Sequence, residues 1–460
     1  MTPTSTDPFR RSLAGLIVVL VVLCGVFLTL GYLQGPKLTD AQVDTQAVTS
    51  RSGQQLRLFA NQPVAAVTAD QVSVTPDARV SVTTSGDVIA VQFDQPLHYA
   101  TDYVVRVEGV RGTSLPQAST LEYRFTTAGT SIYSLHRIPD ADDEIVTENL
   151  TGADRAVVFT SARIVDFAVV GRALAVITLA DDDSTALHLV SLTDGAVETV
   201  PLPGPGVLSD LHASSVGFLI GVVFTPEGAG AAALGGRELL TLDVGGRRAF
   251  TAVTGLDGSA LAVAAWGFVP GGTTLVAQSA EQTMLLVDAS APAIPTPLGK
   301  FAELVGFSSD GRTMVVRDAV GPISVSLVDA TQTRFVPAPI DGAAPFVGDV
   351  ATLANGGMVE KAAVQASDGT FTVSLVVDDG TAGRVLFETP GGTGSIESFS
   401  VSPNDQYVVA EVVPDNAARV SDGYPRDPRS TTLSTVIIDL ATGTVVRTVD
   451  GFGLQFAPAG

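Results

Sequence analysis

Two acidic runs and one insert of mixed charge are the segments of this chain that are candidates for binding a ligand. The insert spans residues 414–430, and the runs read Asp140-Ala-Asp142-Asp143-Glu144 and Asp181-Asp182-Asp183. Clustered carboxylates attract basic partners, and their oxygens are the ligands that Ca²⁺ prefers. Neither run has the Asp-x-Asp-x-Asp-Gly spacing of a calcium loop, so a basic or cationic partner is the first expectation and Ca²⁺ the second.

The candidate docking residues come from these three loops. They are Asp140, Asp142, Asp143, Asp181, Asp182, Asp183, Asp422, Tyr424 and Arg426. A tyrosine among charged residues is a frequent contact residue in interfaces, which brings Tyr424 into the set. The alternative interpretation is that these loops are solvated surface that keeps an acidic protein soluble, and both interpretations stay open.

The sequence lacks the usual catalytic and cofactor motifs. No Gly-x-Ser-x-Gly nucleophile elbow and no Lys-Ser/Thr phosphate loop occurs in it. The histidines, at positions 98, 136, 188 and 212, have no metal-ligand spacing. We therefore expect neither a catalytic residue nor a resident cofactor.

Composition narrows the classes of partner. The 460 residues carry a net charge of −22, and a surface this acidic repels the phosphate backbone of nucleic acid. The single cysteine, Cys24, excludes an intramolecular disulfide, so the folded part must be held by packing.

An uncharged segment near the N-terminus predicts a membrane anchor. Residues 13–33 carry no charge, and as a helix they would extend about 31 Å, enough to cross a bilayer core. Arg10 and Arg11 precede the segment, which predicts a cytoplasmic tail over residues 1–12 and a single-pass membrane protein with its bulk outside the cytoplasm. A cleaved signal peptide and a lipoprotein acylated at Cys24 are the alternatives.

The next segments predict a linker and a small β-module. Residues 34–50 are polar and lack periodicity, so we expect a linker there. Residues 51–128 alternate apolar and polar side chains, as in Leu121-Glu-Tyr123-Arg-Phe125, which indicates half-buried antiparallel strands. The density of such strands predicts a β-sandwich.

Part of this module resembles a known family. The run from Phe93 to Val107, with its apolar strand, Pro-Leu pair and following Tyr103, and the closing Phe125-Thr-Thr are similar to the bacterial Ig-like domain of S-layer and other surface proteins. The chain departs from that family at Ala100, where Pro or Gly is common, and it lacks the family's Asp-x-x-Gly-Asn. The resemblance implies a spacer or adhesive module, with Tyr103 at a corner between strands.

Internal repetition dominates residues 131–460. A strand, a Gly-containing turn and a second strand recur about every 40 to 55 residues, for example around Asp310-Gly311 and Asn355-Gly356. In most repeats an apolar residue followed by Asp precedes a later turn, at Asp243, Asp288, Asp329, Asp378 and Asp439. The pattern resembles the TolB-type and WD-repeat-type β-propellers, which implies one four-stranded blade per repeat.

The chain ends on a strand that has no partners nearby in sequence. Residues 454–460 match the innermost strand of a repeat but stop at its turn. We expect the missing three strands from residues 132–137, 144–150 and 155–160, which would close a ring and remove its free edges. Seven blades are predicted, with six or eight still open.

The alternating direction of the strands places loops of the same kind on the same face of the ring. Loops between the second and third strands of each blade share one face, so the acidic runs and the insert would form an arc there.

Three hypotheses of function follow from the sequence. The first hypothesis is a non-catalytic binding or scaffolding protein of the cell envelope, whose partner is a protein or an envelope polymer. The second is a lactonase-type or glycan-lyase-type enzyme with a site at the channel mouth, and the third is a sensor component of envelope signalling. The enzyme would use carboxylates near separate strand starts, namely Asp166, Glu303, Asp349 and Glu397.

Overall fold

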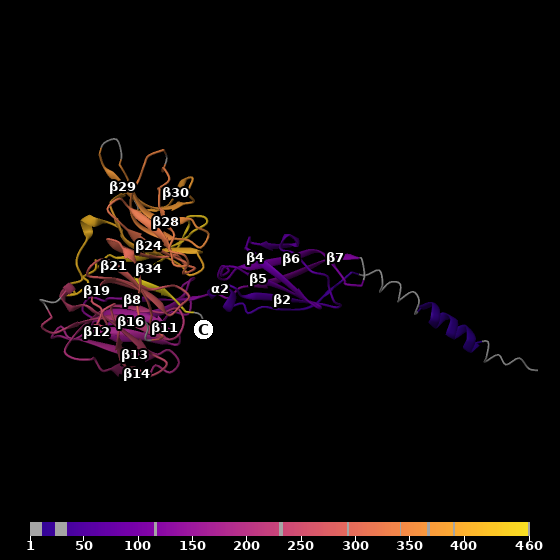
Figure 1. Ribbon diagram of the computed structural model, residues 1–460, viewed down its shortest axis with the longest axis horizontal. Helices are drawn as coiled ribbons and strands as arrows, with labels where there is room; N and C mark the ends of the chain where they lie inside the picture. The colour runs from indigo at the N-terminus through magenta and orange to yellow at the C-terminus, as the bar shows by residue number, and fades with distance from the viewer. Residues whose placement is uncertain are drawn as a thin grey trace, which may run out of the picture. The chain divides into compact units, whose positions relative to one another are not determined.

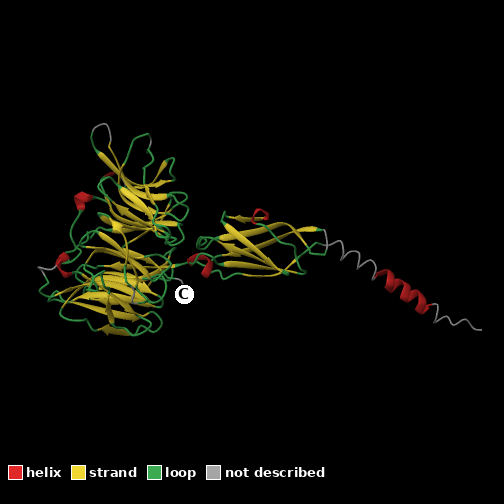
Figure 2. Ribbon diagram, viewed as in Figure 1, coloured by secondary structure: helices red, strands yellow, loops and turns green. Residues whose placement is uncertain are grey.

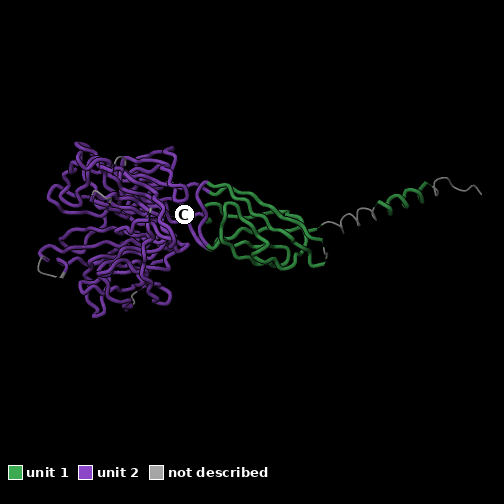
Figure 3. The backbone as a smooth tube through the Cα atoms, turned by 90° about the horizontal axis from the view of Figure 1, so that it is seen from above, with its two compact units in different colours: residues 1–48, 53–94, 101–127 green, residues 49–52, 95–100, 128–460 purple. Residues whose placement is uncertain are grey.

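The structure is a computed structural model in which the chain divides into two compact units (Figure 3). It describes residues 12–23, 35–114, 117–229, 233–291, 294–340, 342–365, 369–389 and 392–458. Unit 1 comprises residues 1–48, 53–94 and 101–127, and unit 2 comprises residues 49–52, 95–100 and 128–460. The secondary structure is almost entirely β, as the composition predicts (Figure 2).

The predicted anchor is only partly covered by the described residues. Residues 12–23 are helical, and their large apolar side chains, from Leu13 to Leu23, are exposed. Residues 1–11 and 24–34, which include Cys24 and the rest of the predicted span, lie outside the described residues. Within the described part of the chain, no helix has both the length and the apolarity to cross a membrane.

Unit 1 contains two antiparallel sheets. The first has the order β1 (Leu38–Gln42), β2 (Gln55–Ala60), β5 (Val88–Phe93) and β4 (Val80–Ser85), and the second has β3 (Val72–Thr75), β6 (Asp102–Arg111) and β7 (Ala118–Thr126). Alternate residues of β5 are buried, as the period of two predicts. Phe93 of one sheet and Phe125 of the other have ring centroids 6.3 Å apart, so the apolar faces pack together, and Tyr103 is buried against Phe125.

The predicted linker is partly wrong. Residues 38–42 form β1, which pairs with β2 from Leu38↔Ala60 to Gln42↔Arg57, and α2 (Ala47–Ser50) follows. An edge strand gains its pairing from backbone groups that every residue type except proline carries, so a polar sequence joins a sheet without an apolar face. The alternation that revealed the other strands is therefore missing from β1.

Unit 2 has a β-propeller fold (Figure 1). Its described residues form seven four-stranded antiparallel sheets, and neighbours in each are hydrogen-bonded. From the inner to the outer strand, they are β35 (Phe452–Phe456), β8 (Ser131–His136), β9 (Asp143–Asn149), β10 (Ala156–Ser161); β11 (Ile164–Val170), β12 (Ala173–Leu179), β13 (Thr185–Ser191), β14 (Val197–Val200); β15 (Gly206–Ala213), β16 (Leu219–Pro226), β17 (Glu238–Asp243), β18 (Phe250–Ala252); β19 (Val263–Phe268), β20 (Thr274–Ser279), β21 (Thr283–Asp288), β22 (Thr296–Lys300); β23 (Glu303–Phe307), β24 (Thr313–Arg317), β25 (Pro322–Ser326), β26 (Gln332–Arg334); β27 (Phe346–Thr352), β28 (Met358–Gln365), β29 (Phe371–Asp378), β30 (Gly383–Glu388); and β31 (Ser395–Val401), β32 (Tyr407–Val413), β33 (Ser434–Asp439), β34 (Val445–Val449).

The turns form as their residue types predict. Gly311 and Gly356 both have positive φ, +68° and +90°, in the hairpins expected there. The recurring aspartates accept hydrogen bonds from backbone N–H groups two or three residues downstream, as at Asp288 with Ser290 and at Asp439 with Thr442. These local bonds mark the end of the third strand in successive sheets.

The predicted closure of the ring is confirmed. β35 pairs with β8, and Phe456 lies opposite Ile132. Gln455 also reaches the next sheet, because its amide nitrogen donates to the Phe167 carbonyl at 2.7 Å and its oxygen accepts from the Val169 N–H at 2.9 Å. Inner strands contact one another from β11 through β15, β19, β23 and β27 to β31, and β35 contacts both β33 and β11.

Polar side chains also join some of the sheets to the start of the next inner strand. Nε of Arg237 donates to the Val263 carbonyl at 3.3 Å, and an η nitrogen of Arg317 donates to the Gly348 carbonyl at 2.6 Å. Gln278 donates to the carbonyls of residues 301 and 302 in the same way. These bonds give the backbone carbonyls side-chain donors from the preceding sheet.

Candidate binding surface

The predicted docking residues lie in loops of three neighbouring sheets. The loops span residues 137–142 between β8 and β9, 180–184 between β12 and β13, and 414–433 between β32 and β33, and the last contains a short 3-10 helix, η4 (Asn416–Ala418). Each loop joins the second and third strands of its sheet, as expected. The sheets are neighbours because β33 contacts β35 and β8 contacts β11.

Arg137, which the sequence did not single out, is the centre of this region. Its guanidinium carbon lies 3.7 Å from the centroid of the Tyr424 ring, and its Nη1 lies 2.8 Å from a carboxylate oxygen of Asp422. The Arg137 and Asp422 side chains are only 4% and 9% exposed, so this ion pair is buried. A buried guanidinium needs partners in its own plane, and the aromatic face adds a cation–π contact.

The same guanidinium also donates to backbone carbonyls of the insert and of β11, the first strand of the next sheet. Nη1 donates to the Asp427 carbonyl at 3.0 Å, and Nε and Nη2 donate to the carbonyls of Ile164 and Val165, each at 3.3 Å. Arg137 follows β8, Asp427 belongs to the insert, and Ile164 begins β11. One side chain therefore fixes the insert to two neighbouring sheets.

Asp143 has a structural role beneath the surface. Its side chain accepts the Tyr424 hydroxyl and the N–H groups of Ile138 and Ile164, at 3.3 and 2.8 Å for the two nitrogens. Asp143 is only 2% exposed, and burial raises its pKa. Burial and the adjacent carboxylate also raise the pKa of Tyr424. Both side chains are therefore parts of a packed network.

A second arginine completes the network. Nη1 of Arg429 lies 3.2 Å from Glu411, and its Nε and Nη2 bond the Asp427 carboxylate at 3.1 and 2.9 Å. The guanidinium carbons of Arg137 and Arg429 lie 5.0 and 5.3 Å from the centroid of the Phe452 ring in the closing strand. We call this group the Arg137 cluster: Arg137, Asp143, Glu411, Asp422, Tyr424, Asp427, Arg429 and Phe452.

The remaining predicted docking residues lie outside the Arg137 cluster. The side chains of Asp140, Asp142 and Asp181–Asp183 are exposed, and Asp181 forms a surface ion pair with Arg163 at 2.6 Å. Asp182 accepts from Ser184, which lowers the Asp182 pKa. Arg426 is half-buried, and its Nε has no hydrogen-bond partner among the described residues. Only Asp143, Asp422 and Tyr424 of the predicted set are brought together by the contacts above.

The four carboxylates of the enzyme hypothesis do not converge on one site, although two of them share an arginine. Glu303 pairs with Arg317 at 2.7 Å, and Asp349 lies 4.0 Å from the same arginine. The two others are Glu397, paired with Arg419 at 2.6 Å, and Asp166, which accepts two backbone N–H groups and has a pKa raised to about 7 by desolvation. In the described ranges, no group of three or more His, Cys, Asp or Glu side chains is placed to hold a metal ion. These contacts do not favour a channel-mouth enzyme site.

The network residues that sequence reasoning missed are Arg137, Glu411 and Phe452, whereas Asp427 and Arg429 belong to the predicted insert but not to the predicted docking residues. Their partners lie far away in the sequence, as Arg137 and Asp422 are 285 residues apart. No local motif marks such a pair. The one available signal was the predicted ring closure, which puts the loop after residue 136 beside the insert.

Comparison with known proteins shows no family for this chain. No family model matches the chain, and no curated protein matches it. The solved structure of TolB from Acinetobacter baumannii is 13% identical and has a TM-score of 0.37, over 86% of this chain and 88% of that one. A putative 6-phosphogluconolactonase from Bacteroides uniformis is 13% identical with a TM-score of 0.44, over 71% and 99%. The propeller domain of the Trilobed protease from Pyrococcus furiosus is 10% identical with a TM-score of 0.42, over 77% and 95%. These likenesses leave ligand and activity to be argued from the residues.

Proposed function

We propose that this chain is a non-catalytic binding or scaffolding protein of the cell envelope, in which a seven-bladed propeller is presented on an Ig-like spacer. Seven four-stranded sheets support the number of blades, and the two packed sheets of unit 1 support the Ig-like interpretation. Residues 13–33 would anchor the chain in the cell membrane with residues 1–12 in the cytoplasm. The exposed apolar side chains of the helical residues 12–23 support this anchor.

The observation that carries the proposal is the order of the insert. Within it, the N–H of Asp422 donates to the Arg429 carbonyl at 2.9 Å, and the N–H of Thr431 donates to the Val420 carbonyl at 2.8 Å. The Asp422 carboxylate, which also holds Arg137, accepts the N–H groups of Tyr424 and Arg429. A loop already fixed in one conformation loses little entropy when a partner binds.

The exposed groups beside this ordered insert indicate the chemistry of the partner. Five carboxylates, those of Asp140, Asp142 and Asp181–Asp183, are exposed in the adjoining loops, and Val420 of the insert is 60% exposed. An acidic rim attracts a basic partner, and an exposed aliphatic side chain adds apolar contact area. We infer a protein or an envelope polymer with basic groups as the partner.

Crosslinking in intact envelopes tests this function. One variant carries the five rim substitutions Asp140→Asn, Asp142→Asn, Asp181→Asn, Asp182→Asn and Asp183→Asn, which remove charge and keep side-chain shape. A second replaces residues 416–430 by a short Gly-Ser loop. We expect both variants to lose the same crosslinked partner, with the rim variant retaining less than a fifth of the wild-type yield.

The matched control removes five exposed charges elsewhere. Asn or Gln replaces Asp70, Asp77, Asp87, Asp94 and Glu108 of unit 1, all of which are exposed. This control should keep the full crosslinked yield. A partner list that is identical for wild type, rim variant and loop variant would contradict the proposal.

A further inference from the structure

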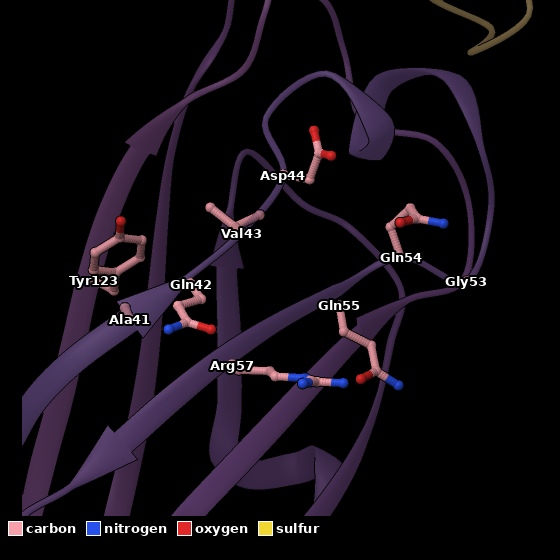
Figure 4. A pocket seen from close by; sticks show the side chains of 9 residues that line it. All are labelled: Ala41, Gln42, Val43, Asp44, Gly53, Gln54, Gln55, Arg57 and Tyr123. Atoms are coloured by element: carbon pink, nitrogen blue, oxygen red, sulfur yellow. The ribbon is translucent and has the colours of Figure 1, made fainter. Parts of the chain in front are cut away.

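A polar pocket in unit 1 is separate from the propeller surface described above. It is a shallow hollow, largely open to solvent, with a volume of about 780 Å³. Residues 41–44, at and after the end of β1, residues 53–55 and 57, and Tyr123 of β7 line it. Figure 4 shows Tyr123 at one end, Gln54 and Gly53 at the other, and Arg57 and Gln55 between them.

Several polar groups of the pocket are unpaired. The side chains of Gln42, Gln54 and Arg57 make no hydrogen bond or ion pair with any residue that the structure describes. Gln55 uses its amide nitrogen on Gln92 at 3.2 Å, which leaves its own oxygen open. Carboxamides both donate and accept and a guanidinium donates only, so the pocket offers hydrogen bonds of both kinds.

The rest of the lining adds one carboxylate and one aromatic ring. Asp44 accepts the N–H groups of Gln46 and Ala47 through one oxygen, at 3.1 and 2.9 Å. Tyr123 is half-buried and supplies an apolar ring with a hydroxyl at its edge. Arg57 and Asp44 are the only charged side chains of the lining, and their charges cancel.

We propose that this pocket binds a neutral carbohydrate chain. Sugar hydroxyls donate and accept together, which matches carboxamides, a guanidinium and a carboxylate side by side. The apolar C–H face of a pyranose ring packs on an aromatic ring, the role that Tyr123 takes. The net charge of −22 repels acidic polymers, and one carboxylate is too few for a metal ion, so a neutral polyhydroxylated ligand fits the lining best.

Affinity electrophoresis of the whole 460-residue chain tests this site. Native gels contain soluble dextran, arabinogalactan or hydroxyethylcellulose, and parallel gels contain polygalacturonate or no polymer. We expect at least one neutral polymer to retard the wild-type chain and polygalacturonate to leave its mobility unchanged. The double variant Gln42→Ala/Arg57→Ala and the single variant Tyr123→Ala should each bind at least fivefold more weakly.

The controls separate binding from folding and from the propeller. Arg124→Ala alters the next residue of β7, whose side chain is 72% exposed and outside the pocket, and should keep the wild-type retardation. Tyr123→Phe keeps the ring and should retain most of the binding, even if Tyr123→Ala disturbs the sheet. The proposal is overturned if no neutral polymer retards the chain, if polygalacturonate retards it most, or if the double variant binds as wild type. The rim variant of the propeller should bind these polymers normally, so this test is independent of the proposed function.

Discussion

The Arg137 cluster of the propeller and the polar pocket of unit 1 are built from similar residue types with opposite results. In the cluster, Arg137 and Asp422 are almost fully buried and are bonded to each other and to backbone groups. In the pocket, the exposed Arg57 has no such partner within the described residues. A polar residue that is buried and paired stabilises architecture, whereas one that is exposed and unpaired remains available to a ligand.

The largest expected effect comes from breaking the cluster. Arg137→Ala leaves Asp422 buried without its cation and removes the contact with Tyr424, so the free energy of unfolding should fall by about 3–5 kcal/mol. Chemical denaturation followed by tryptophan fluorescence measures this, because the single tryptophan, Trp266, is buried in unit 2.

Two variants sharpen that comparison. Arg137→Lys keeps the charge but loses the planar arrangement of donors. It should restore only part of the unfolding free energy that Arg137→Ala loses. Arg155→Ala removes an arginine that is 50% exposed and lies 3.9 Å from Glu144 in the same sheet, and should cost less than about 0.5 kcal/mol. Equal losses of unfolding free energy for Arg137→Ala and Arg155→Ala would show that the Arg137 cluster stabilises the fold no more than an exposed ion pair does.

Glu360 is the counterexample, a buried carboxyl without such partners. It is 0% exposed, neither oxygen has a hydrogen bond among the described residues, and burial with nearby Asp378 raises its pKa to about 7. The folded state therefore holds this proton to higher pH than the unfolded chain does, and stability falls as pH rises from 4.5 to about 7. Glu360→Gln should remove this fall and raise the unfolding free energy at pH 8 by about 2 kcal/mol.

The check is a set of denaturation curves between pH 4 and pH 8. Glu388→Gln in the same sheet is the control, since Glu388 is exposed, and it should leave the pH profile unchanged. A Glu360→Gln profile that still declines over this interval would locate the titrating group elsewhere.

A smaller effect is expected at the closing strand. Gln455→Ala removes two hydrogen bonds from the β11 backbone and should lower the unfolding free energy by about 1–2 kcal/mol. Gln332→Ala in the outer strand β26, where the side chain is exposed, should change it by less than about 0.5 kcal/mol. The same denaturation measurement applies, and an equal response at both positions would argue against a role for Gln455 in closure.

The smallest effect is expected in the pocket. Arg57→Ala removes an exposed side chain without an internal partner, so the unfolding free energy should change by less than about 0.5 kcal/mol. Differential scanning calorimetry of the full chain measures this. A large loss would mean that Arg57 supports unit 1 and is not free for a ligand.

Ring closure could be predicted from the sequence because repetition leaves the strand at residues 454–456 without the other three strands of its sheet. Hairpin turns could be predicted from Gly and Asp. β1 escaped prediction because an edge strand needs only backbone groups. The acidic loops were found by composition, but composition cannot separate the buried Asp143 from the exposed Asp142. That separation depends on Ile164, from the next sheet along the chain, and on Tyr424, which the closed ring brings to Asp143.

Hydrogen–deuterium exchange across residues 414–433 tests most directly whether the insert is a preformed surface. In the wild type, the N–H groups of Asp422, Arg429 and Thr431 are hydrogen-bonded, and their peptides should exchange slowly without any partner present. In Arg137→Ala these peptides should exchange at least tenfold faster, while β20 and β21 keep their protection. Fast exchange of the insert in the wild type, or equal rates in the two proteins, would contradict the account.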